Sequence, residues 1–223
     1  MSNEQLAVSN SEGGSLPLAP TAYAFSATPS AGSSPQRPHI ICVTGQMAAG
    51  KNFICSQLEK EGFVSLDLDS VAHEGILLCT PQILEAFSAI ATSRGISLLN
   101  ADGSLNRRAL GKIVFSSPEL LAQQEAIVYP KIIELANQFI DENSGKNVIL
   151  NATVLFKTLA LLSKCEKILF VKANFLKRLY RAKKRDKLPL CQILARFKNQ
   201  KNLLAEYQKT ANKFQIPIEI IKN

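Results

Sequence analysis

The chain has 223 residues, of which 46% are apolar, and this size favours one compact catalytic domain with a substantial core. Its five cysteines are odd in number and form no CxxC pair, which argues against a disulfide framework and favours a reducing compartment. The N-terminal residues include Glu4 and no apolar run long enough for a signal peptide or a membrane span, so we expect a cytoplasmic protein with no membrane partner.

The formal net charge of +8 is concentrated in the C-terminal part of the chain. Residues 164–223 contain sixteen Lys or Arg against four Asp or Glu, so the preceding part is mildly acidic. Such a basic segment can contact the phosphates of a nucleic acid, can close over a small polyphosphate ligand, or can be a solvated helix face. Charge alone leaves these three interpretations open.

Residues 1–37 are rich in Ser, Ala, Gly, Pro and Thr, carry few charges and show no helical or strand periodicity. This composition predicts a disordered low-complexity extension, followed by a folded domain at 38–223. Within that domain, short apolar runs rich in β-branched residues predict strands at 39–44, 63–67, 147–152, 167–172 and 216–221. Stretches with helical spacing separate them, so we expect an α/β fold with a five-stranded parallel sheet flanked by helices.

The long interval between the second and third expected strands contains several helical stretches, including 117–143. We therefore expect a separate helical region at about 80–145. A basic helical stretch is expected at 174–186, with a break near Pro189 and a further helix that continues toward residue 210.

Residues 45–52 match the GxxxxGK pattern of a Walker A loop, directly after an expected strand and before an expected helix. Glycines allow the backbone to approach phosphates with its N–H groups pointing inward, and the following helix adds its positive N-terminal end. Lys51 is expected to reach the β- and γ-phosphates as a catalytic residue. A glycine-rich turn without function is the alternative. The predicted ATP-binding residues here are Gly45, Ala48, Ala49, Gly50, Lys51, Asn52 and Phe53.

The last position of this loop departs from the pattern. Ser or Thr normally ligates Mg²⁺ there through a hydroxyl, whereas this chain has Asn52. A carboxamide oxygen is also a hard ligand, but it lies farther from the backbone and requires a shifted metal or an intervening water. We expect ATP with Mg²⁺ as the cofactor and Asn52 as the candidate metal ligand.

Two carboxylates, Asp67 and Asp69, end the second expected strand. Ligands of open α/β sheets bind at the carboxyl edge of the strands, so a carboxylate there can accept the proton of an attacking hydroxyl or hold magnesium through water. The alternative is that Asp69 is the N-cap of the helix that follows.

The segment 101–115, ADGSLNRRALGKIVF, resembles the DGxLxRxxLGxxVF segment of dephospho-CoA kinases, and Pro118 and Tyr129-Pro130 follow at the spacing of that family. The resemblance extends over about 39–223. It implies a P-loop NTPase fold and an enzyme that transfers a phosphoryl group from ATP to the ribose 3′-hydroxyl of dephospho-CoA. The partners would then be dephospho-CoA and ATP.

The resemblance also implies roles for residues near the acceptor. Asp69 falls on the second aspartate of the family's DxD-like strand end, where a general base is expected. Arg107 is expected to hold dephospho-CoA, because a guanidinium pairs well with phosphate. Asp67 and Tyr129 are the further candidates for substrate binding.

In the same family, arginines of a lid close over the ATP phosphates, and Arg181, Arg185 and Gln200 keep the spacing of that lid at about 174–205. Arg185 is also a catalytic candidate, because it would neutralise charge on the transferring group. This interpretation explains the basic C-terminal part without a nucleic-acid partner. The lysines nearby, Lys183 and Lys184, are expected to be plain surface residues.

Four positions differ from the family pattern. Thr153 and Lys157 replace a usual proline and glutamate, Tyr129 replaces a histidine, and His73 replaces an arginine. These differences leave two alternatives open: a kinase of another nucleoside or nucleotide, and a degenerate homologue that binds ATP without catalysis. A monomer or a weak homo-oligomer is expected.

Overall fold

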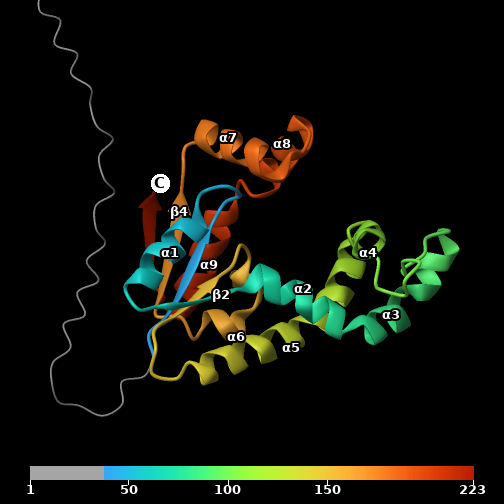
Figure 1. Cartoon of the computed structure of the whole chain (residues 1–223), viewed down its shortest axis with the longest axis horizontal. Helices are drawn as coiled ribbons and strands as arrows, with labels where there is room; N and C mark the ends of the chain where they lie inside the picture. The colour runs from blue at the N-terminus through green and yellow to red at the C-terminus, as the bar shows by residue number, and fades with distance from the viewer. Residues whose placement is uncertain (1–37) are drawn as a thin grey trace, which may run out of the picture. The chain divides into compact units, whose positions relative to one another are not determined.

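A computed structural model describes residues 38–223 (Figure 1). The extension expected at 1–37 lies outside the described residues. In the described part, five parallel strands form one sheet in the order β2-β3-β1-β4-β5. The strands are β1 (Ile40–Gly45), β2 (Val64–Asp67), β3 (Val148–Asn151), β4 (Lys167–Lys172) and β5 (Ile218–Lys222). The expected parallel sheet is confirmed, with strand bounds that differ by one or two residues.

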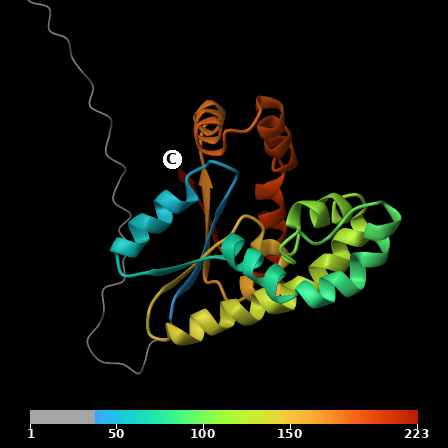
Figure 2. The same ribbon diagram turned by 45° about the vertical axis from the view of Figure 1, so that its right-hand side comes forward.

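The helices follow the strands in the order α1 (Lys51–Lys60), α2 (Leu68–Leu78), α3 (Thr80–Ser93), α4 (Arg107–Val114), α5 (Pro118–Glu142), the 3-10 turn η1 (Leu155–Lys157), α6 (Leu159–Leu162), α7 (Phe175–Asp186), α8 (Leu190–Asn199) and α9 (Leu203–Phe214). Helices α2 to α5 form the helical region expected between the second and third strands (Figure 2). The expected break near Pro189 separates α7 from α8, where Lys187 has φ of 51°. Among residues 38–223, no single helix is long and apolar enough to cross a membrane, and only α2 and α3 together, across a bend of 72°, reach that length and composition.

Both faces of the sheet are covered by helices, which is why its strands read as continuous apolar runs. Successive residues of β1 alternate between two core clusters. Cys42 belongs to the cluster that includes buried residues of α2 to α5 and α9, whereas Val43 packs in the cluster that includes Ile54 and Leu58 of α1. The sheet therefore holds α1 on one face and the helical region on the other.

Close packing of α2 against α5 holds the helical region together. A Cβ atom at Gly75 of α2 would lie 3.3 Å from Ile132 Cγ1 and 3.5 Å from Val128 Cγ1, so a larger residue there would push the two helices apart. Phe87 of α3 and Ile113 of α4 are completely buried in the same cluster. The region is thus part of the main core, and it begins directly after Asp67 at the carboxyl edge of the sheet.

Candidate active site

A cavity of about 1120 Å³ lies at the carboxyl ends of β1, β2 and β3. The phosphate loop, residues 45–52, forms one wall, and polar side chains of α7 and α8 form another. The predicted site residues that line this cavity are Ala48, Ala49, Gly50, Lys51, Asn52, Asp67, Asp69, Arg181 and Arg185. Gln200, which keeps the spacing of the family's lid, lines it as well.

Backbone conformation makes the glycines of the phosphate loop necessary. Gly45 has φ of 154°, and a Cβ atom there would lie 2.4 Å from the carbonyl oxygen of Val171 on β4. Gly50 has φ of 100° and is the N-cap of α1, so the free N–H groups of the helix face the loop. Ala48 also has a positive φ, 59°. The chain is thereby folded into the turn that a phosphate requires.

The carbonyl of Ala49 is held by a residue from the far end of the chain. Asn223 Nδ2 donates to Ala49 O at 2.9 Å, and Arg181 Nη1 donates to the same oxygen at 3.4 Å. A Cβ atom at Gly50 would lie 1.9 Å from Asn223 Nδ2, the end of a flexible side chain, so the φ of 100° is what favours glycine here. Phe53 lies one turn into α1, is 46% exposed and does not line the cavity.

The outer turn of the phosphate loop is fixed by Arg178 and Gln200. Arg178 Nε donates to Met47 O at 2.9 Å, and its Nη1 donates to Gln46 Oε1 at 2.8 Å. Met47 N donates to Gln200 Oε1 at 2.6 Å, and Gln46 Nε2 donates to Gln200 O at 3.0 Å. Four hydrogen bonds therefore tie two loop residues to α7 and to the end of α8.

Arg178 is a buried cation that the sequence analysis missed. The residue is 6% exposed, and its guanidinium carbon lies 4.2 Å from the centre of the Phe197 ring. Its Nη2 is buried and has no hydrogen-bond partner among residues 38–223, and burial lowers the pKa of Arg178. The available signal was helical spacing, since Arg178 lies four residues before the buried Ala182 and hence on the same face of α7.

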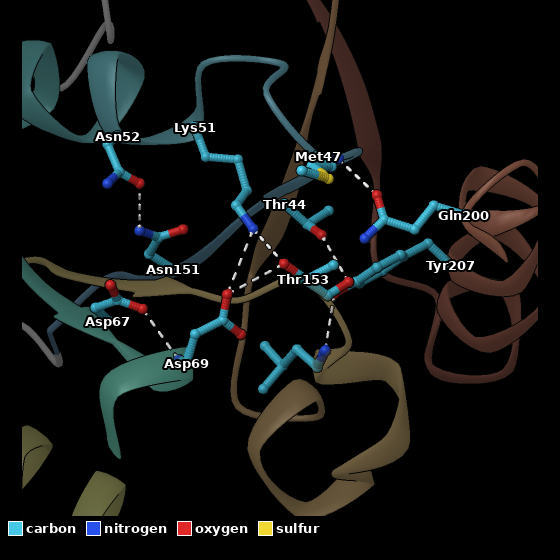
Figure 3. Close-up of polar contacts among 11 residues, drawn as sticks. Thr44, Met47, Lys51, Asn52, Asp67, Asp69, Asn151, Thr153, Gln200 and Tyr207 are labelled. Atoms are coloured by element: carbon cyan, nitrogen blue, oxygen red, sulfur yellow. Dashed lines mark hydrogen bonds and ion pairs between the residues drawn. The ribbon is translucent and has the colours of Figure 1, made fainter. Parts of the chain in front are cut away.

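Lys51 and Asp69 are linked by the hydroxyl of Thr153 (Figure 3). Lys51 Nζ donates to Thr153 Oγ1 at 2.5 Å, and Thr153 Oγ1 donates to Asp69 Oδ2 at 3.2 Å. The direct distance from Lys51 Nζ to Asp69 Oδ2 is 4.0 Å. Burial lowers the pKa of Lys51, and the nearby Asp69 and Asp67 partly offset this effect. The predicted base and the predicted phosphate-binding lysine therefore meet in one cluster.

The helix cap falls on Asp67 and not on Asp69. Asp67 Oδ1 accepts a hydrogen bond from Asp69 N at 3.0 Å, and α2 begins at Leu68. The alternative that Asp69 is the N-cap is therefore wrong, because the helix starts earlier than the apolar pattern indicates. With this cap supplied by Asp67, the carboxylate of Asp69 is left to face Lys51 and Thr153.

Asn52 is paired with Asn151, the last residue of β3. Asn151 Nδ2 donates to Asn52 Oδ1 at 3.1 Å, and Asn151 lies opposite Asp67 in the register of β2 and β3. Asn151 is 5% exposed, and its Oδ1 has no hydrogen-bond partner among the described residues. Sequence analysis missed Asn151, although a polar residue at the end of an apolar strand was the available signal.

This carboxamide pair fits a magnesium site of the kind found with nucleotides. No three His, Cys, Asp or Glu side chains within residues 38–223 gather as a metal cluster, so the protein offers no closed cage of such side chains. Asn151, Asp67 and Asp69 line the same cavity, and their side-chain oxygens are hard donors. Mg²⁺ usually takes one or two protein oxygens, with waters and phosphates completing its coordination.

Basic side chains of α7 and α8 face the phosphate loop across the cavity. Arg181 and Arg185 line it as expected, and so do Lys184 and Arg196. Lys184, which was expected to be a plain surface residue, is exposed and also lines the cavity. Arg196 was missed, although it lies one helical turn before Gln200. Arg185 also forms a hydrogen-bonded pair with its neighbour Asp186, at 2.6 and 3.1 Å.

Arg107 and Tyr129 lie in the helical region and do not line this cavity. Arg107 is the exposed first residue of α4, which is capped by the side chain of Asn106. Tyr129 is half-buried on α5, and its pKa is raised by burial and by its contact with Glu125. Lys157 Nζ donates to the same carboxylate, Glu125 Oε1, at 2.5 Å. The replaced positions 129 and 157 are thus joined through one glutamate.

Comparison with known proteins agrees with this geometry. Residues 39–214 match the family model described as dephospho-CoA kinase. The chain is 38% identical to the dephospho-CoA kinase of Treponema denticola over 178 residues, which cover 78% of this chain and 79% of the relative. It is 35% identical to that of Treponema pallidum over 170 residues, which cover 75% and 80%.

Solved structures show the same fold. A protein from Thermus thermophilus superposes with a TM-score of 0.68 at 25% identity, covering 84% of this chain and 91% of its own. The dephospho-CoA kinase from Campylobacter jejuni superposes with a TM-score of 0.57 at 26% identity, covering 82% and 87%. The resemblance inferred from segment 101–115 is confirmed, and the chain belongs to the dephospho-CoA kinase family.

Proposed function

We propose that this protein phosphorylates the ribose 3′-hydroxyl of dephospho-CoA with ATP, giving coenzyme A and ADP. The observation that carries the proposal is the meeting of Lys51 and Asp69 at the mouth of the phosphate loop, 4.0 Å apart, in a member of this family. Lys51 belongs to the part of the cavity where ATP would bind, and Asp69 lies where the part for dephospho-CoA would begin. The two residues thus lie where a phosphoryl group would pass from ATP to dephospho-CoA.

ATP would bind with its phosphates in the loop of residues 45–52. The backbone N–H groups and the N-terminus of α1 supply positive partial charge there, and Lys51 Nζ supplies a full one. Arg181, Arg185 and Arg196 reach the cavity from α7 and α8. They would neutralise the charge that develops on the transferring group, and these helices would exclude water from it.

The chemistry requires a single in-line displacement. Asp69 accepts the proton of the 3′-hydroxyl as the acceptor oxygen attacks the γ-phosphorus. The new O3′–P bond forms while the bond from phosphorus to the β,γ-bridging oxygen breaks, and ADP leaves with the electron pair. No covalent enzyme intermediate is involved.

Magnesium would be held by oxygens of the Asn52 and Asn151 pair together with the nearby aspartates, directly or through water. When bound, it neutralises charge on the β- and γ-phosphates. The support for this placement is the buried Asn151 Oδ1, which has no hydrogen-bond partner in the described part of the chain. Replacement of the usual hydroxyl by Asn52 would then shift the ion toward β3.

Acceptor binding is assigned to Asp67, Arg107 and Tyr129. Arg107 is exposed at the start of α4, where its guanidinium is available to the diphosphate of dephospho-CoA. Tyr129 and Asp67 would contribute from α5 and from the end of β2. All five cysteines are free thiols, which supports a reducing, cytoplasmic location.

The test is a coupled assay for ADP with purified protein, Mg-ATP and dephospho-CoA, with the product identified by mass. We expect ADP and coenzyme A in equal amounts. ADP formation with another nucleoside or nucleotide, but not with dephospho-CoA, would favour a kinase of different specificity. ATP binding with no phosphoryl transfer across several acceptors and divalent metals would indicate a noncatalytic homologue.

A further inference from the structure

Thr153 lies between Lys51, which would bind phosphate in the proposed mechanism, and Asp69, which would act as the base. Its hydroxyl is 2.5 Å from Lys51 Nζ and 3.2 Å from Asp69 Oδ2. The direction of both hydrogen bonds follows from the donors available. An ammonium group only donates, so Thr153 Oγ1 accepts from Lys51, and the single hydroxyl proton is then given to the carboxylate. When Lys51 is protonated and Asp69 is ionised, the directions of both hydrogen bonds are therefore fixed.

The backbone on either side of this hydroxyl is held from the buried core. Tyr207 OH accepts from Leu155 N at 2.9 Å and donates to the carbonyl of Thr153 at 3.4 Å. Thr44 Oγ1, on β1, donates to the same carbonyl at 3.4 Å. Tyr207 and Thr44 are completely buried, and the ring of Tyr207 packs edge-on against that of Phe170. Thr153 is therefore attached to a rigid support.

We propose that Thr153 is a positioning residue, whose hydroxyl occupies Asp69 Oδ2 and so presents Asp69 Oδ1 to the acceptor hydroxyl, while it holds Lys51 at the phosphate side. Lys51 has three N–H donors, of which Thr153 takes one, so the others remain available for phosphate oxygens. The part of this inference that concerns the acceptor rests on the proposed function, because it takes Asp69 as the base.

Charge explains why a neutral spacer is useful here. Besides Asp69, the groups that act on Lys51 are Asp67 and the thiols of Cys42 and Cys55. Burial raises the pKa of each thiol to about 12, so both thiols are neutral at physiological pH. Within residues 38–223, the carboxylates are then the anions that act on the ammonium. Lys51 Nζ and Asp69 Oδ2 are 4.0 Å apart, and the Thr153 hydroxyl bridges them. Without this hydroxyl, the two side chains could form a direct ion pair, which would draw Lys51 away from phosphate and Asp69 away from the acceptor.

The first test is steady-state kinetics of Thr153→Val, which keeps the branched shape and removes the hydroxyl. We expect kcat with dephospho-CoA to fall about tenfold, with the KM for ATP changed less than about twofold, because the loss acts on alignment and not on nucleotide binding. Thr153→Ser, which keeps the hydroxyl, should recover most of the rate. A matched control is Thr158→Val, because Thr158 is a buried threonine of the same segment whose hydroxyl donates to Leu155 O, away from the site.

The second test does not depend on activity. Lysine ammonium groups held by hydrogen bonds give observable ¹H–¹⁵N correlations, and Lys51→Arg identifies the signal of Lys51. We expect this signal to shift or broaden in Thr153→Val and to persist in Thr153→Ser and Thr158→Val. An unchanged Lys51 signal in Thr153→Val, or an unchanged kcat when the wild type turns over dephospho-CoA, would overturn the inference. Inactive wild-type protein would instead count against the proposed substrate, and the spectra would still decide the role of Thr153.

Discussion

The phosphate loop and the helical region of α2 to α5 hold their candidate site residues by different kinds of contact. In the loop, partners come from far along the chain: Gln46 and Arg178 are 132 residues apart, Ala49 and Asn223 are 174 apart, and Lys51 is bonded to Thr153. In the helical region, contacts are more local. Arg107 starts a helix capped by the preceding residue, and Tyr129 meets Glu125 on the same helix.

The proposed ATP-binding side is therefore preorganised by tertiary structure, whereas the proposed acceptor-binding side depends on side chains displayed on packed helices. Changes in the loop or in the residues that hold its backbone should therefore affect catalysis and nucleotide binding together. Changes at the start of α4 should affect only the binding of the acceptor, dephospho-CoA. Four substitutions can test this division between the two sides.

Replacement of Lys51 by alanine should nearly abolish turnover. The lysine supplies charge that is used in the transition state, and loss of one such stabilising group lowers kcat by about 10²–10³-fold. The measurement is kcat by ADP release, with melting temperature as a check on folding. Lys60→Ala, at the exposed end of the same helix, is the control and should retain the wild-type rate. Substantial turnover by the Lys51 variant would mean that the loop is not the phosphate site.

Replacement of Arg178 by alanine tests whether the support of the loop matters as much as the loop. The change leaves Met47 O and Gln46 Oε1 without their donor, which should cost about 1–3 kcal/mol of stability and weaken ATP binding about tenfold or more. Calorimetric titration with Mg-ATP and thermal unfolding measure the two effects. The matched control is Lys177→Ala, an exposed position next to it on α7.

If ATP affinity is unchanged in the Arg178 variant while stability falls, then Arg178 only holds α7 and α8 together. In that case the preorganisation of the loop backbone would rest on Gln200, Asn223 and Arg181. The difference in preorganisation between the phosphate loop and the helical region would then be smaller.

Replacement of Arg107 by alanine should affect the acceptor side alone. A charge-assisted hydrogen bond to phosphate is worth about 1.5–3 kcal/mol, so the KM for dephospho-CoA should rise about tenfold while the KM for ATP stays within about twofold. Arg108→Ala, an exposed neighbour in the same turn, is the control. Equal effects of both variants would show that the charge of the helix start is what matters, and not the position of Arg107.

Sequence patterns predicted the sheet, the loop and the helical region because each depends on local periodicity or on a short motif. Helical spacing put Arg178 on the same face of the helix as Ala182, but the sequence could not indicate that Arg178 binds Met47, because a basic helix is usually a solvated face. It placed Asp67 and Asp69 at the right edge of the sheet. It could not decide which of them caps α2, because that choice depends on a start position that differs by one turn or less.

The Asn52 and Asn151 pair shows the same limit for metal binding. Asn52 is visible in the loop motif, but its partner is 99 residues away and is identified only by the register of β2 with β3 and of β3 with β1. The sequence therefore predicted Asn52 as the metal ligand, with a strand-end carboxylate able to hold magnesium through water, and did not indicate Asn151. The structure shows that the Oδ1 of Asn52 already accepts a hydrogen bond from Asn151, whose own Oδ1 has no hydrogen-bond partner among the described residues.

Replacement of Asn52 by serine should change activity less than the other three substitutions, and the direction of its effect distinguishes two kinds of metal site. Serine restores a hydroxyl that can ligate Mg²⁺ directly, so the Mg²⁺ concentration for half-maximal activity at fixed ATP should fall about threefold. The same change removes the acceptor of Asn151 Nδ2, which should cost about 1 kcal/mol of stability. A titration with Mg²⁺ and one with Mn²⁺ measure the first effect, and thermal unfolding measures the second.

The control is Gln57→Ser, which removes a carboxamide from the same helix away from the loop. Should Asn52→Ser need more Mg²⁺ than the wild type, the carboxamide pair is itself the better metal site, and the change at position 52 is an adaptation of the nucleotide side and not a loss.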